Sequence, residues 1–405
     1  MMKLQGKHIV LGLTGGIACY KSAELCRRLI DQGAQVTVVM TEAATHFITP
    51  TTMQALSHHP VFINTQDDRM DNSMAHINLS RQADLILIAP CSADFIAKLA
   101  HGFANDLLST LCLARGACPL AIVPAMNREM WSNPATQRNI SLLQQDSIHI
   151  WGPANGIQAC GETGYGRMLE VPQIMAECQA FFTPSILVGK KVLITAGPTE
   201  EPIDPVRMIT NRSSGKMGYA IAQAAFNAGA NVHLISGPTA LATPYGVTIE
   251  KVRTAREMHQ AVLSQASTYD IFISVAAVAD WHIDNYTEHK QKKQDQQGLQ
   301  LHFSPNPDIL AEVAHLDKSP WCVGFAAETE NLNQYAQEKR LRKGVPLLVG
   351  NLAQQVMEAD TTTMVLFDDK GEEQLPTLPK DEAAQRLIEA IAKRYTSASI
   401  SHLKT

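Results

Sequence analysis

The chain has 405 residues, of which 45% are hydrophobic and 18% charged, and its formal net charge is −5 at pH 7. This length predicts two or three domains with cores of their own, and the composition is that of an ordinary globular protein. The negative charge argues against a general nucleic-acid surface, no apolar run reaches the roughly 18 residues of a membrane-spanning helix, and the N-terminus lacks a secretory signal pattern. We therefore expect a cytoplasmic protein that binds neither nucleic acid nor membranes.

The first half of the chain alternates apolar strands with helical stretches. Runs such as LILIA and LAIVP are continuously apolar, which is typical of parallel strands covered on both faces. We expect strands at 8–12, 35–40, 84–89, 119–123 and 148–151, and helices at 17–32, around 43–57, at 93–100, 105–113 and 133–145.

The stretch 152–170 has a different character. It holds five glycines and little apolar periodicity, which predicts a mobile surface flap beside a site. A helix is expected at 172–182, and 183–189 is the expected linker, which places the domains at 1–188 and 189–405.

The second half repeats the alternation of strands and helices. We expect strands near 191–195, 231–235, 249–252, 270–275, 321–325, 346–350 and 363–367, with a helix near the C-terminus. The segment 282–304 is polar and aperiodic, and it predicts an arm that leaves the sheet. The fold class predicted for the whole chain is α/β, with two Rossmann-like domains.

Each half opens with a strand, a glycine-rich turn and a helix, at 8–41 and 191–237. A helix N-terminus at the end of a parallel strand favours a phosphate. Neither start contains GxGxxG, and the GK of the second is followed by Met217 instead of the Ser or Thr of a Walker A loop. A mononucleotide such as FMN suits the first start, although a tight turn without a ligand is also compatible with it.

Four features could carry chemistry, and each also has an ordinary structural explanation. His76 is either an acid–base group at a site edge or a satisfied histidine. Asn127, after a buried strand, could donate its amide to a substrate carboxylate or cap the next helix. Cys160 lies in the glycine-rich flap, where its thiol could deliver a proton, whereas most of the other seven cysteines are expected to be buried. The KQKK run from Lys290 is either a solvated loop or a source of positive charge for a phosphate.

Taken together, these segments resemble one family. HIVLGLTGGIACYK, MAHINLSRQADLILIAPCSAD, VPAMN and ACGETGYGRM resemble phosphopantothenoylcysteine decarboxylases of the flavin-dependent cysteine decarboxylase superfamily. ITAGPTEEPIDPVRMITNRSSGKMG, AAVADW, KQKK, NPDIL and GFAAET resemble phosphopantothenate–cysteine ligases. The order and fusion are similar to the bacterial bifunctional proteins of coenzyme A biosynthesis, so the resemblance implies an N-terminal flavoprotein domain and a C-terminal nucleotide-binding ligase domain.

For the first domain the resemblance implies FMN-dependent decarboxylation of 4′-phospho-N-pantothenoylcysteine to 4′-phosphopantetheine. FMN would supply the electron sink by oxidising the substrate thiol. In that scheme Asn127 holds the carboxylate, His76 assists the oxidative decarboxylation and Cys160 donates the proton. The FMN phosphate or ribityl chain would meet Gly15, Gly16 and Ser92.

For the second domain the resemblance implies ligation of cysteine to 4′-phosphopantothenate through an acyl-cytidylate, with CTP as co-substrate and Mg²⁺ on its phosphates. Asn211 would stabilise the intermediate and Lys290 would contact the nucleotide phosphate, while the metal ligands stay unidentified. The other implied nucleotide-binding positions are Ser274, Val275, Ala276, Asp280, Asn306, Pro307, Asp308, Ile309, Phe325, Lys339 and Lys343.

The resemblance also implies a homo-oligomer, with FMN sites between decarboxylase subunits and ligase domains paired as dimers. Three alternatives stay open. One is another flavin enzyme with an accessory domain, such as a prenyltransferase or a lantibiotic-type decarboxylase. The others are an NAD-dependent dehydrogenase with two Rossmann units, which the absence of GxGxxG disfavours, and a nucleotide-sensing binding module.

Overall fold

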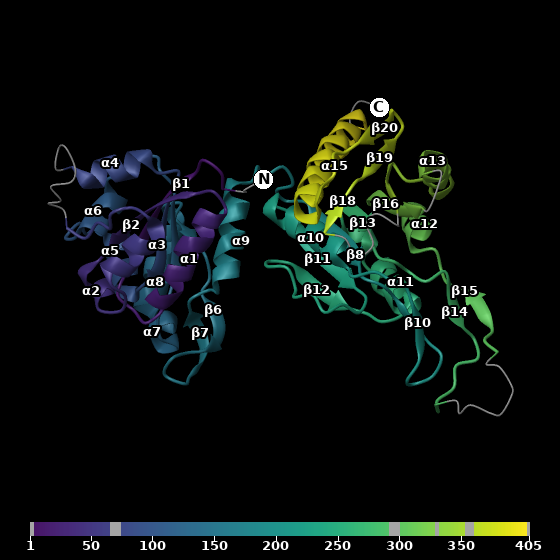
Figure 1. Cartoon of the computed structure of the whole chain (residues 1–405), viewed down its shortest axis with the longest axis horizontal. Coiled ribbons are helices and arrows are strands. Elements are labelled where there is room, and N and C mark those ends of the chain that lie inside the picture. The colour runs from purple at the N-terminus through teal and green to yellow at the C-terminus, as the bar shows by residue number, and fades with distance from the viewer. Residues whose placement is uncertain (1–3, 65–73, 291–299, 329–331, 353–359, 403–405) are drawn as a thin grey trace. The chain divides into compact units, whose positions relative to one another are not determined.

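The computed structural model describes residues 4–64, 74–290, 300–328, 332–352 and 360–402. Contacts divide the chain into two compact units, residues 1–182 and 183–405, whose elements are labelled in Figure 1. Leu187 is buried in the core of the second unit, so part of the expected linker packs there. The expected domain boundary at 188/189 itself stays a prediction.

A five-stranded parallel sheet forms the centre of the first unit. Its strands follow the order β2-β1-β3-β4-β5, which is a doubly wound α/β arrangement. The strands are buried because their side chains are apolar on both faces, as the sequence predicted. They are β1 (His8–Leu13), β2 (Gln35–Met40), β3 (Leu85–Cys91), β4 (Leu120–Pro124) and β5 (His149–Ile150).

Helices connect these strands, and some of them differ from expectation, including the short α7, which was not expected. The single helix expected around 43–57 is wrong, because the Thr49 hydroxyl accepts from Thr52 N (3.2 Å) and Pro50 starts a new helix. The helix α4, which carries His76, was not expected. The helices are α1 (Cys19–Asp31), α2 (Glu42–Thr45), α3 (Pro50–Ser57), α4 (Ala75–Gln82), α5 (Ala93–His101), α6 (Leu107–Leu113), α7 (Arg128–Ser132), α8 (Pro134–Gln145) and α9 (Val171–Phe182).

The glycine-rich stretch forms an antiparallel β-hairpin, although its sequence lacks a strand pattern. Its strands are β6 (Ala154–Ile157) and β7 (Thr163–Arg167). The hairpin rests on the segment after β4, where Met126 N donates to Gly166 O (2.9 Å). Gly166 has φ +128°, and a Cβ there would come within 2.5 Å of Met126 O, so this close approach requires glycine.

The second unit is built on an eight-stranded sheet in the order β12-β11-β8-β13-β16-β17-β19-β20. Strands β12 to β17 in this order are mutually parallel and follow the Rossmann order 3-2-1-4-5-6, while β19 and β20 add antiparallel pairs. The strands are β8 (Lys191–Ala196), β11 (Asn231–Ser236), β12 (Thr248–Lys251), β13 (Ile271–Ser274), β16 (Trp321–Glu328), β17 (Leu347–Leu352), β19 (Val365–Asp368) and β20 (Gly371–Gln374).

Two helical layers cover this sheet. One hydrophobic cluster joins the sheet to α10 (Lys216–Asn227) and α15 (Lys380–His402). Another joins it to α11 (Ala255–Leu263), α12 (Ile309–Ala314) and α13 (Leu332–Lys343). Smaller elements are the 3₁₀ turn η1 (Ala266–Thr268) and the pairs β9 (Glu200–Pro202) with β10 (Met208–Thr210), β14 (Trp281–Ile283) with β15 (Phe303–Pro305), and β18 (Thr361–Thr362) with β21 (Leu378–Pro379).

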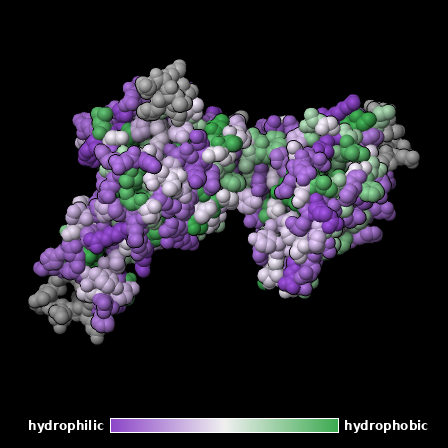
Figure 2. Space-filling view, turned by 180° about the vertical axis from the view of Figure 1, so that it is seen from behind, coloured by the Kyte–Doolittle hydropathy of each residue, from purple (hydrophilic) through white to green (hydrophobic). Residues whose placement is uncertain are grey.

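The expected polar arm starts at β14 and returns at β15, and it extends away from the sheet of its own unit (Figure 1). Lys290 lies on this arm, whereas the rest of the KQKK run falls outside the described residues. The visible face of each unit is mostly hydrophilic, with scattered apolar residues (Figure 2). No helix in the described part of the chain is long and apolar enough to span a membrane.

Candidate active sites

The first site lies at the carboxyl ends of the neighbouring strands β1 and β3. The connection after β1 leads to β2 on one side, and the connection after β3 leads to β4 on the other side, so the two loops separate at this point. The Gly15–Gly16 turn follows β1, and Ser92 follows β3. The Thr14 hydroxyl ties the two loops together, since it donates to Pro90 O (2.8 Å) and accepts from Ser92 N (2.9 Å). Doubly wound sheets of this strand order bind flavin mononucleotide at this switch point.

A cavity of about 580 Å³ opens at this switch point, within the usual size of a ligand pocket. Gly15, Gly16 and Ser92 form one part of its wall. A Cβ on Gly15 would lie 2.7 Å from Ala43 Cβ, which explains the glycine. The remaining wall is largely apolar, with Ile17, Met126, Met130, Ile157 and Met168. A glycine-containing turn before a helix, beside apolar walls, suits the phosphate and the ring of a flavin nucleotide.

Asn127 performs the capping role that the sequence left open, and its role toward a substrate carboxylate stays a prediction. Its Oδ1 accepts from Glu129 N (2.8 Å) and so caps α7. Its Nδ2 then points the other way and donates to Glu162 Oε2 (2.7 Å). The cap therefore orients the amide, and a carboxylate of the same chain already accepts from one of its two N–H donors.

Cys160 lies at the turn of the hairpin, next to Asn127 and on the cavity wall. Its Sγ is 3.6 Å from Asn127 Nδ2 and 3.7 Å from Glu162 Oε2. Of the eight cysteines, six are buried, Cys118 is half-buried and Cys160 is exposed, as expected. Burial raises the pKa of Cys19 and Cys26 to about 11, so these thiols are inert neighbours.

The sequence analysis missed two charged residues of this site. Glu162 lies in the glycine-rich stretch, and its acidic side chain close to Cys160 was the sequence feature that could have identified it. Lys21 is buried on α1 and its Nζ donates to Met168 O (3.1 Å) and pairs with Glu170 (3.0 Å). Glu170 also pairs with Arg167 of β7. Lys21 therefore connects the end of the hairpin to α1, the helix that follows the Gly15–Gly16 turn.

His76 is half-buried on α4, which packs against α6. It is absent from the described wall of the cavity. One chain therefore brings together two of the three expected catalytic residues, Asn127 and Cys160, with the expected flavin-binding positions.

The second site lies at the corresponding switch point of the other sheet, between the ends of β8 and β13. The Thr195 hydroxyl accepts from Val275 N (3.2 Å) and Ala276 N (3.3 Å), directly after Ser274. Asn211 reaches the same loop, and its Nδ2 donates to Ala277 O (2.9 Å). Open α/β sheets bind ligands at this point, so the structure brings these predicted residues to one edge.

A second group of predicted residues borders this edge. Asn306 N donates to Asp280 O (2.8 Å), and Asn306 Nδ2 donates to Ala279 O (2.9 Å). Pro307 follows, Ile309 is buried at the start of α12, and Phe325 packs against the core from β16. Asn306 Oδ1 is buried without a partner among the described residues. A buried acceptor of this kind is available to a donor group of a ligand.

Lys343 holds Asp308 at the start of α12. Its Nζ lies 2.6 Å from Asp308 Oδ2, while Asp308 also accepts from Ala311 N (3.1 Å). Burial works to raise the pKa of Asp308, but the hydrogen bond and charge of Lys343 together with the Ala311 N–H lower it below its ordinary value. Lys339 lies one turn earlier on α13.

Two cations of the second unit are placed differently. Lys216, at the start of α10, pairs with Asp360 (2.7 Å). Lys290 is exposed on the arm between β14 and β15, and this arm extends away from the sheet of its own unit (Figure 1). Within the described ranges no three His, Cys, Asp or Glu residues are grouped so that they could hold a metal ion.

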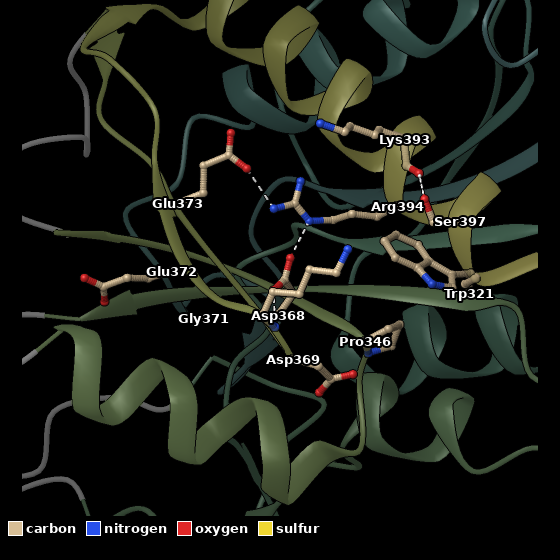
Figure 3. A pocket seen from close by; sticks show the side chains of 12 residues that line it. Trp321, Pro346, Asp368, Asp369, Gly371, Glu372, Glu373, Lys393, Arg394 and Ser397 are labelled. Carbon is tan, nitrogen blue, oxygen red and sulfur yellow. Dashed lines mark hydrogen bonds and ion pairs between the residues drawn. The ribbon is translucent and has the colours of Figure 1, made fainter. Parts of the chain in front are cut away.

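A cavity of about 610 Å³ lies elsewhere in the second unit (Figure 3). Trp321 opens β16 and Pro346 precedes β17, so the cavity lies at the edge opposite the predicted nucleotide site. Arg394 points into it between Asp368 (2.7 Å) and Glu373 (2.8 Å). None of the predicted site residues lines it.

The folds and sites therefore define a two-domain nucleotide-binding enzyme. A family model described as Flavoprotein matches residues 2–183, and one described as DNA/pantothenate metabolism flavoprotein C-terminal domain matches residues 187–395.

Two relatives match nearly the whole chain, and a solved structure matches about half of it. The chain is 50% identical over 396 residues to the Coenzyme A biosynthesis bifunctional protein CoaBC of Vibrio cholerae, covering 96% of this chain and 99% of that protein. It is 48% identical over 401 residues to the protein of the same name from Escherichia coli, covering 97% and 98%. A crystal structure of the C-terminal domain of Coenzyme A biosynthesis bifunctional protein CoaBC is 37% identical, covers 53% of this chain and 99% of that chain, and has a TM-score of 0.46.

The chain belongs to the family of bifunctional coenzyme A biosynthesis proteins. It is an enzyme that combines a flavoprotein decarboxylase unit with a ligase unit. The predicted family, fold class and pair of activities are confirmed, and the dehydrogenase and binding-module alternatives are wrong.

Proposed function

We propose that the first unit decarboxylates 4′-phospho-N-pantothenoylcysteine to 4′-phosphopantetheine, and that the second unit makes this substrate from 4′-phosphopantothenate, cysteine and CTP. The observation that carries the first half is the convergence of Asn127 and Cys160 on one cavity at the β1/β3 switch point. The same cavity holds the Gly15–Gly16 turn and Ser92, which would bind FMN.

Within the decarboxylase site the residues of this chain would bind the cofactor, orient the substrate carboxylate and donate the final proton. The Gly15–Gly16 turn and Ser92 would hold FMN, which would supply a two-electron sink for the substrate thiol and the electrons for the final reduction. The Asn127 amide is oriented by its own helix cap and would hold the substrate carboxylate. The Cys160 thiol, exposed on the cavity wall, would donate the final proton.

His76 requires a second copy of the chain in this proposal. It does not line the cavity of its own chain, although the resemblance assigns it to the oxidative decarboxylation. A homo-oligomer with the flavin site between decarboxylase units would supply His76 from a neighbour. The exposed arm that carries Lys290 supports a similar pairing of ligase units.

In the ligase site Asn211 would stabilise the acyl-cytidylate formed from CTP. The nucleotide would occupy the edge formed by residues 274–280 and 306–309, where the buried Asn306 Oδ1 is available to a donor group. Lys339 and Lys343 would face its phosphates, and Lys290 would reach them from the arm of a second copy of the chain. Mg²⁺ would bind chiefly through phosphate oxygens and water, because the described residues offer no three-ligand cluster.

The test is one incubation with defined omissions. Pure protein receives 4′-phosphopantothenate, cysteine, CTP and Mg²⁺, and mass spectrometry follows the products. We expect 4′-phosphopantetheine with all components and no product without CTP, whereas added 4′-phospho-N-pantothenoylcysteine should react without CTP. The purified protein should also show the yellow absorbance of FMN. A colourless protein without decarboxylation would refute the first half, and full activity with ATP alone would refute the CTP assignment. The expected cytoplasmic location stays a prediction.

A further inference from the structure

One N–H donor of the Asn127 amide is already occupied by a carboxylate of the same chain. Glu162 Oε2 lies 2.7 Å from Asn127 Nδ2, which is an ordinary charge-assisted hydrogen bond. The same oxygen lies 3.7 Å from Cys160 Sγ. One carboxylate oxygen thus sits at the point where the amide and the thiol converge.

The turn of the hairpin holds Glu162 in this position. Gln158 N donates to Glu162 O (2.8 Å), and Gly161 N donates to Gln158 O (2.9 Å). Gly161 has φ +85°, which lets the chain reverse between Cys160 and Glu162. Both side chains therefore face Asn127 from a single tight turn.

We propose that Glu162 is a specificity-determining residue of the decarboxylase site, whose carboxylate takes the place of the substrate carboxylate on Asn127 while the site is empty. This inference rests on the proposed function, which assigns the Asn127 amide to the substrate carboxylate. Asn127 Nδ2 carries two N–H donors, of which one reaches Glu162 and the other faces Cys160 Sγ (3.6 Å). A substrate carboxylate on the same nitrogen would lie against the Glu162 carboxylate, and like charges repel at this distance. A ligand with a carboxylate must therefore displace Glu162.

Arg128 supplies a second partner for the displaced carboxylate. Its Nε lies 3.8 Å from Glu162 Oε2 and 3.0 Å from Glu129 Oε1. The Glu162 side chain is 42% exposed, so it can turn toward solvent without losing a buried environment. When CO₂ leaves, Asn127 loses its acceptor and Glu162 returns to it, which helps to expel a product that lacks the carboxylate.

The test compares two unreactive ligands that differ by the carboxylate alone, the serine amide and the ethanolamine amide of 4′-phosphopantothenate. A hydroxyl replaces the thiol in both, so neither is oxidised. Their dissociation constants are measured on the full-length, FMN-loaded protein by calorimetry and by perturbation of the flavin spectrum. Glu162→Gln removes the charge, and Glu162→Ala removes the acceptor. Glu129→Gln is the matched control, since it removes a carboxylate from the same Arg128 and keeps the backbone N–H of residue 129 that caps onto Asn127 Oδ1.

We expect both Glu162 variants to bind the serine amide about fivefold to tenfold more tightly than the wild type, because no competing charge-assisted hydrogen bond has to be broken. Binding of the ethanolamine amide should change less than twofold, and Glu129→Gln should alter neither. Unchanged or weaker binding of the serine amide in both variants would overturn the inference, as would an equal gain for both ligands. A wild-type protein that binds neither ligand would refute the proposed decarboxylase function itself.

Discussion

Replacing Gly166 with alanine should detach the hairpin that carries Cys160. The residue has φ +128°, a conformation that costs a side-chain-bearing residue about 1–3 kcal/mol. The added Cβ would also lie 2.5 Å from Met126 O and 2.9 Å from Gln158 Nε2. Relief of that clash breaks the hydrogen bond from Met126 N to Gly166 O, worth about 1 kcal/mol. The total penalty on the docked hairpin is therefore about 2–4 kcal/mol.

The assay follows decarboxylation of 4′-phospho-N-pantothenoylcysteine, with ligation by the same preparation as an internal control. If the whole penalty reaches the transition state, kcat/KM for decarboxylation falls about 30-fold to 1000-fold, while ligation is unchanged. Amide hydrogen exchange should accelerate in residues 154–167. Gly156→Ala is the matched control, because its Cβ meets only the flexible Arg167 side chain, at 3.1 Å from its Nη1. Wild-type exchange and wild-type decarboxylation in Gly166→Ala would refute the reasoning.

Four further predictions concern the two units separately. Cys160→Ser should still release CO₂ but accumulate a species two hydrogens lighter than the product, whereas His76→Asn should block CO₂ release. Mass spectrometry of the products separates these two outcomes. Normal product formation by Cys160→Ser would contradict the role assigned to Cys160. Asn211→Asp should leave the acyl-cytidylate detectable but slow its capture by cysteine by about 2–4 kcal/mol in activation free energy, and Lys290→Gln should weaken an earlier, nucleotide-dependent stage. Equal loss of decarboxylation in either variant would contradict separate sites. Residues 1–188 alone should bind FMN and decarboxylate added substrate, and a folded fragment without flavin would contradict the predicted boundary. The pKa of Asp308 is lower in the folded protein than its ordinary value of 3.8, so its pair with Lys343 stabilises the second unit at pH values above 3.8. This contribution is lost as the pH falls through the lower folded pKa. Asp308→Asn should therefore be less stable at neutral pH and should lack this acid-dependent loss in thermal unfolding of the isolated unit.

The sequence by itself determined the features that depend only on residues close together along the chain. Continuous apolar runs identified β3 and β4, because strands buried on both faces need apolar side chains at every position. The glycine-rich turn after β1 identified the first nucleotide-type start, since local backbone freedom and a following helix are readable in order. The odd position of Cys160 outside any apolar element also indicated its exposure.

The tertiary structure decided how distant segments meet. Strand order places Gly15 beside Ser92 and the β8 end beside Ser274, and no local pattern encodes that pairing. The hairpin forms because its backbone groups find partners in each other and in Met126, although its side chains lack a strand pattern. The contact between Glu162 and Asn127 joins residues 35 positions apart, so it exists only once the hairpin docks on the loop after β4. Hydrogen bonds depend on where folded segments arrive, and that position is set by the packing of the whole unit.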